Sequence, residues 1–175
     1  MGTVGTQPSI AMLDAMDAAD FMAAVGLLFE DAPAYLSLLA AARPFGTWDG
    51  LFRAASDVAH TAPGAVQVEL LAAHPRIGAP PVTVSSLSYR EQGYDREQQD
   101  AIAALGPLND AYEARFGFRY VIFVAGRPRS AIVPLLTETL QGDPDTERRR
   151  GLDDVVAIAR ARAIGLGMLE EEMTG

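Results

Sequence analysis

The chain has 175 residues, of which 49% are hydrophobic and 21% charged, so it can build the core of one folded domain and is not a disordered chain. Fourteen basic against 23 acidic residues leave a net charge of −9, which opposes binding to nucleic acid or to an anionic membrane surface. The chain contains no cysteine, and every basic residue is arginine, which excludes thiolate and lysine Schiff-base chemistry.

Residues 1–12 are rich in small and polar residues and predict a flexible N-terminal segment before a domain over residues 13–170. Apolar residues at helical spacing predict a first helix from Asp14 or Asp17. Further helices are expected after Asp31, from Thr47 to about His60, and from Pro63 until His74-Pro75 ends that helix.

The second half of the chain predicts helices over residues 88–105, 107–116, 128–140 and 146–169, separated by glycine- and proline-containing stretches. Residues 118–124 are aromatic and β-branched but have no other strand to pair with, so we expect a buried extended segment or the start of an apolar helix. The sequence therefore predicts an all-α protein: a single compact domain of seven to eight helices.

His74 is one of only two histidines, and it lies where Pro75 breaks a helix before the turn at Gly78. This context predicts a rigidly held imidazole at a surface or cleft. The alternative, that His74 only caps the last carbonyls of its helix, is equally compatible with the spacing. His60 ends an ordinary helix, and we expect it to be structural or exposed.

Two other tracts allow both a structural and a functional interpretation. Ser88 and Glu91 have the spacing of a helix capping box, but a helix N-terminus can also bind an anionic ligand, with Glu91 and Gln92 beside it. Arg160 and Arg162 are two residues apart on a helix, so only one of them can face a given pocket.

Taken together, these tracts resemble the 2-oxo-4-hydroxy-4-carboxy-5-ureidoimidazoline (OHCU) decarboxylases of urate breakdown. The resemblance covers about residues 18–165 and rests on short motifs in a compatible order. They are Phe29-Glu30-Asp31-Ala32-Pro33, Arg43-Pro44-Phe45, Ala73-His74-Pro75-Arg76-Ile77-Gly78, Ser88-x-x-Glu91-Gln92, Leu108-Asn109 through Phe118, Gly126-Arg127 and Ile158-Ala159-Arg160-x-Arg162.

The resemblance implies an all-helical fold, usually a homodimer, that converts OHCU to (S)-allantoin and CO₂ without a cofactor or metal. It implies catalytic roles for His74, Glu91 and Arg162. The expected substrate-binding residues are Pro75, Ser88, Gln92, Tyr120, Val121, Ile122, Phe123 and Val124. The negative net charge opposes nucleic acid and an anionic membrane surface as partners. Because no membrane-spanning or secretory segment is recognisable, we expect a cytoplasmic protein.

OHCU carries its carboxylate on a carbon that also bears a hydroxyl and adjoins a ring C=N, so the substrate supplies its own electron sink. The protein then needs to provide orientation, charge and a positioned proton donor. Gly93 directly after Gln92, and Ala161 and Ala163 around Arg162, depart from the family pattern without removing a reacting group. There are two alternatives to OHCU decarboxylation: the chain is a sister lyase that acts on another small ureido-carboxylate, or it is a non-catalytic helical interaction module.

Overall fold

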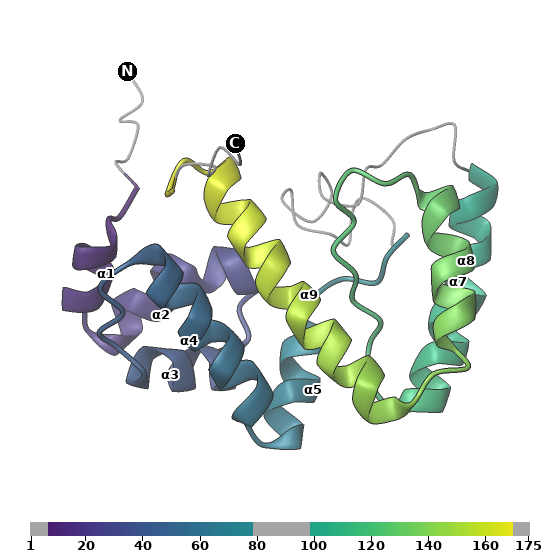
Figure 1. Ribbon diagram of the computed structural model, residues 1–175, viewed down its shortest axis with the longest axis horizontal. Coiled ribbons are helices and arrows are strands. Elements are labelled where there is room, and N and C mark those ends of the chain that lie inside the picture. Colours follow the sequence, from purple (N-terminus) through teal and green to yellow (C-terminus); the bar gives the residue numbers. More distant parts are fainter. Residues whose placement is uncertain (1–6, 79–98, 170–175) are drawn as a thin grey trace.

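The computed structural model describes residues 7–78 and 99–169, and in these two ranges it contains eight helices and no strand. Figure 1 shows α9 (Pro144–Gly165) running diagonally through the molecule, with the N-terminal helices on one side and α7 and α8 on the other. The remaining helices are α1 (Ile10–Ala15), α2 (Ala18–Phe29), α3 (Pro33–Ala41), α4 (Trp48–Thr61), α5 (Gly64–Ala73), α7 (Gln99–Phe116) and α8 (Arg129–Thr139). The all-α prediction of seven to eight helices is confirmed for the described residues.

Side-chain caps fix where several helices begin. The carboxylate of Asp17 accepts from the backbone N–H of Asp20 and so caps α2. Thr47 caps α4 through the N–H of Gly50, as the sequence predicts. The last helix starts at Pro144 because Asp143 caps it. It ends at Gly165, four residues before the expected end at residue 169.

The N-terminal boundary differs from the expected one. Helix α1 begins at Ile10, inside the segment expected to be flexible, because Ser9 accepts from Met12 and Leu13 is fully buried. The carboxylate of Asp14 also accepts from the backbone N–H groups of Phe45 and Gly46, each at 2.9 Å. These contacts hold the first helix against the loop before α4.

Pro107 does not start a new helix, contrary to the sequence prediction, but lies inside the continuous helix α7. A proline inside a helix removes one backbone hydrogen bond. Leu105 and Tyr112, on either side of it, are fully buried, and Asn109 donates to the carbonyls of Leu105 and Ile77. Tertiary packing therefore outweighs the local preference of proline.

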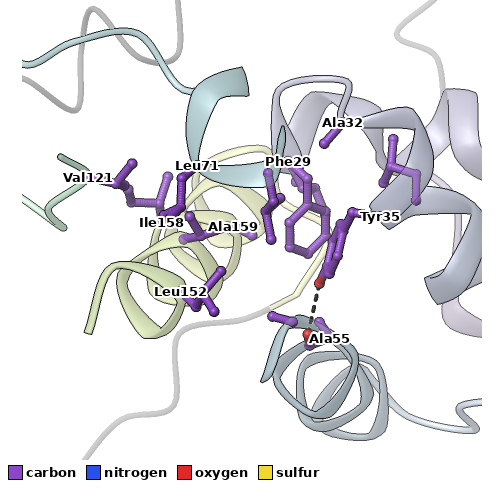
Figure 2. Packing of buried hydrophobic residues seen from close by; sticks show 14 of the residues in the cluster. Phe29, Ala32, Tyr35, Ala55, Leu71, Val121, Leu152, Ile158 and Ala159 are labelled. Carbon is purple, nitrogen blue, oxygen red and sulfur yellow. Dashed lines mark hydrogen bonds between the residues drawn. The ribbon is translucent and has the colours of Figure 1, made fainter. Parts of the chain in front are cut away.

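The core joins the N-terminal helices to α9. Figure 2 shows Phe29 and Tyr35 packed together beside Ala159 of α9, and the Tyr35 hydroxyl donates to the carbonyl of Ala55 at 2.9 Å. The two rings are 5.2 Å apart between centroids, a favourable aromatic distance. This packing brings the end of α2 against the last three turns of α9, where Arg162 lies.

Residues 118–124 form a buried extended segment rather than a helix, which confirms one of the two expectations for this tract. Tyr120, Val121 and Val124 are almost completely buried. Arg150 on α9 donates to the carbonyl of Val121 at 3.0 Å and stacks over the Tyr120 ring. The segment is thus fixed along α9.

Candidate active site

His74 is the C-cap of α5, and its imidazole is buried, with 3% of the residue exposed. Its Nδ1 lies 3.1 Å from the carbonyl oxygen of Leu70. A carbonyl only accepts, so Nδ1 carries the proton and Nε2 presents a lone pair. Nε2 is buried and has no hydrogen-bond partner within residues 7–78 and 99–169. The capping interpretation is therefore correct in its geometry, but it accounts for only one of the two ring nitrogens.

The imidazole is neutral at physiological pH. Burial, and next the positive charge of Arg162, lower the pKa of His74 to about 4. The hydrogen bond to Leu70 and the carboxylate of Glu30 act in the opposite direction. A neutral imidazole with a bare Nε2 accepts a proton before it can donate one, whereas the sequence predicted a proton donor. The burial also differs from the surface or cleft position expected.

Arg162 projects from α9 into the protein, and the residue is 3% exposed. Its Nη1 donates to the carbonyl of Leu28 at 3.0 Å, and its Nη2 donates to the Glu30 carboxylate at 2.8 Å. Arg160 instead pairs with Asp49 at 2.9 Å on the outside of the helix. The two arginines therefore face different directions, as their spacing predicts.

Several side chains hold the turn that follows His74. Arg119 donates through Nη1 to the carbonyls of Ala72 and His74, at 2.8 and 2.7 Å. Arg76 makes a two-bond contact with Glu113, at 2.9 and 2.7 Å. The sequence analysis assigns no role to Glu113 or Arg119, because their contacts with residues 72–76 join distant parts of the chain.

The remaining predicted site residues divide into two groups. Pro75, Ile122 and Phe123 are half-buried, while Tyr120, Val121 and Val124 turn their side chains into the core. Ser88, Glu91 and Gln92, together with Gly93, lie outside the described residues. Of the three predicted catalytic residues, the structure therefore brings His74 and Arg162 together.

Glu30 is the residue of this site that sequence reasoning did not select. It directly follows α2, with its backbone in the left-handed region at φ 55°, and its side chain is 16% exposed. The only signal was its place in the Phe29–Pro33 motif, since its partner Arg162 is 132 residues away. Arg162 and Glu30 thus form an ion pair where α2 meets α9, and both charges act on the neutral imidazole of His74 at the end of α5.

In residues 7–78 and 99–169, no three histidine or carboxylate side chains gather as metal ligands would. None of the helices in these ranges has the length and apolar character needed to cross a bilayer.

Comparison with known proteins places this arrangement in a family. The sequence pattern of OHCU decarboxylase matches residues 14–164. The chain is 31% identical over 153 residues to the uric acid degradation bifunctional protein PucL of Bacillus subtilis, covering 86% of this chain and 31% of that protein. It is 28% identical to the OHCU decarboxylase of Halalkalicoccus jeotgali, covering 90% of each. The chain thus spans about a third of the length of the bifunctional relative.

Solved structures share the fold. A crystal structure of OHCU decarboxylase in the presence of (S)-allantoin superposes with a TM-score of 0.65 at 20% identity, covering 81% of this chain and 94% of that one. A crystal structure of (S)-allantoin synthase superposes with a TM-score of 0.64 at 19% identity, covering 91% of this chain and 54% of that one. With the family pattern matching most of its length, the chain belongs to the OHCU decarboxylase family.

Proposed function

We propose that this chain catalyses the decarboxylation of OHCU to (S)-allantoin and CO₂, without a cofactor. The observation that carries the proposal is the buried His74, whose bare Nε2 lies in the field of the Arg162 guanidinium. Membership of the family supports the reaction class, and the relative from Halalkalicoccus jeotgali is named for this decarboxylation. Such a site offers a base and a fixed positive charge, which are the two groups the substrate chemistry requires.

The reaction follows from the substrate. The bond to the carboxylate breaks, CO₂ leaves, and the electron pair moves through the adjacent carbon onto the ring C=N nitrogen, which takes up a proton from solvent. The neighbouring hydroxyl then gives its proton to Nε2 of His74. His74 returns a proton to the carbon that carries the ureido group, and the hydroxyl becomes a carbonyl. Delivery from one face only would set the S configuration.

Arg162 acts in this scheme as a fixed charge. Both of its terminal nitrogens already donate to protein groups, namely the Leu28 carbonyl and Glu30. A guanidinium held beside the reacting ring stabilises the negative charge that develops on the nitrogen and oxygen. It also offsets the repulsion between an anionic substrate and a chain of net charge −9.

The other assignments remain predictions drawn from the family resemblance. Glu91 would orient the imidazole or a substrate N–H, and Ser88 and Gln92 would bind the substrate from the same segment. Pro75 and the backbone of residues 120–124 would line the site. A homodimer in the cytoplasm is also proposed, and light scattering and cell fractionation test these two points.

The proposed function is tested with freshly generated OHCU. The decay of OHCU and the optical activity of the allantoin formed are followed with and without the protein. The proposal predicts rapid decay and a single enantiomer, whereas the spontaneous reaction gives a racemate. Decay at the spontaneous rate would refute it, and turnover of a different ureido-carboxylate would identify a sister lyase. Binding without any turnover would identify a non-catalytic module.

A further inference from the structure

The turn after α2 adopts a backbone conformation that ordinary residues avoid. Glu30 and Asp31 both lie in the left-handed region, at φ 55° and 54°. Two consecutive non-glycine residues in this region are unfavourable unless the surrounding structure imposes them. Buried Phe29 and Ala32 lie on either side of the turn (Figure 2). Packing on both sides therefore holds the strained turn in place.

A glycine makes room for this turn. The N–H of Asp31 donates to the carbonyl of Gly26, and a Cβ atom at Gly26 would lie 2.2 Å from Oδ1 of Asp31. The absence of a side chain at this position lets the chain fold back tightly against α2. As a result the Glu30 side chain is directed toward α9 and not along the axis of its own helix.

The Glu30 side chain contacts Arg162 of α9. The distance from Nη2 of Arg162 to Oε1 of Glu30 is 2.8 Å, and the Arg162 side chain is 1% exposed. Nη1 donates to the carbonyl of Leu28, in the last turn of α2. One guanidinium thus contacts both the helix end and the strained residue that follows it, so the turn determines its position. The carboxylate and the guanidinium both act on the imidazole of His74, which indicates that the three groups share one poorly solvated region.

We propose that Glu30 is a positioning residue for the decarboxylation, which holds the Arg162 guanidinium in place beside His74. The inference rests on the proposed function, and it assigns the left-handed turn after α2 a role in the site. Glu30 does not touch the reacting atoms in this scheme. It acts through Arg162, so its loss should disturb the transition state more than the binding of substrate.

A structural explanation is that the pair only joins α2 to α9. In that case loss of the carboxylate would lower stability but leave the turnover of the folded protein unchanged. Three variants separate the two explanations. Glu30→Ala removes the contact, Glu30→Gln keeps an oxygen that can accept from Nη2, and Asp31→Asn changes the exposed neighbouring carboxylate in the same turn. Asparagine tolerates the left-handed region, so the last variant is a matched control.

The experiment measures kcat and KM with fresh OHCU per folded molecule, the melting temperature, and the ¹⁵N resonance of the Arg162 Nε–H. We expect Glu30→Ala to lower kcat by roughly tenfold to a hundredfold with a smaller change in KM, because small displacements of a catalytic group have effects of that order. The Arg162 resonance should broaden in this variant. Glu30→Gln should recover a large part of kcat, and Asp31→Asn should match the wild type.

Wild-type kcat in folded Glu30→Ala would overturn the proposal, as would an unchanged Arg162 resonance. If Glu30→Ala does not fold, the proposal depends on Glu30→Gln, whose kcat must lie below that of Asp31→Asn. Failure of the proposed function gives a different result: the wild-type protein would then not accelerate OHCU decay. The Arg162 resonance would still decide whether Glu30 holds the guanidinium.

Discussion

Replacing His74 with asparagine should change stability in opposite directions at two pH values. At pH 7 the variant loses the hydrogen bond from Nδ1 to the Leu70 carbonyl, which contributes about 1 kcal/mol. Under the same conditions it should lose roughly a hundredfold or more in rate, the usual contribution of a general acid–base group. The stability effect alone would be expected from a simple helix cap, so the two measurements must be made together.

The pH dependence follows from the lowered pKa of His74. In the unfolded chain the imidazole titrates near 6.5, whereas in the folded protein it titrates near 4. As the pH falls below 6.5, the unfolded chain takes up a proton that the folded protein does not accept, so the folded state loses stability. Between pH 7 and pH 5 this loss amounts to about 2 kcal/mol. His74→Asn does not have this penalty.

The assay is urea denaturation of both proteins at pH 7 and pH 5. The variant should be less stable than the wild type at pH 7 and equally or more stable at pH 5. The matched control is His60→Asn, which removes the other imidazole, a partly exposed group paired with Asp153. It should keep the wild-type rate. If His74→Asn and the wild type lose stability in parallel between the two pH values, the buried neutral imidazole is refuted.

Three further predictions concern Arg162, the turn after His74 and metal ions. Arg162→Lys should lower activity at least about tenfold, because a single ammonium nitrogen cannot reproduce the planar guanidinium whose two terminal nitrogens separately contact the Leu28 carbonyl and Glu30. Arg160→Lys should be nearly neutral, and equal effects at the two positions would show that the wrong arginine has been assigned. Gly78→Ala should destabilise the fold by about 1–3 kcal/mol in urea, since Gly78 has φ +82°. EDTA should leave activity unchanged, and activity restored by added metal would contradict the cofactor-free scheme.

Local features of this fold could be predicted from the sequence because their causes are local. Thr47 caps α4 within three residues, and the His74-Pro75 pair ends α5 through a clash between adjacent residues. The direction of Arg162 relative to Arg160 follows from helix geometry alone. The continuity of α7 through Pro107 could not be predicted in this way, because it depends on burial against other helices.

The candidate site was only partly predictable for the same reason. The sequence identified His74 as unusual but could not show that the imidazole is buried and neutral, since this depends on what covers it. Glu30 is 132 residues away in the sequence from its partner Arg162, and Arg119 is 45 residues away from His74. A charged residue whose partner is that distant looks like an ordinary surface charge until the helices are packed together.

The pairing of Arg162 with Glu30 also explains how a buried site can be electropositive without an unpaired buried charge. An isolated buried guanidinium would be very unfavourable, and the carboxylate offsets that penalty. At His74, however, the effect of Arg162 is larger than the opposing effect of Glu30. The ion pair therefore acts as a dipole whose positive end dominates at the imidazole. Burial, together with this field, keeps Nε2 unprotonated and ready to accept a proton. The field also stabilises negative charge on a substrate ring placed beside it. Both functions depend on the orientation of the pair, which is fixed by the strained turn at the end of α2.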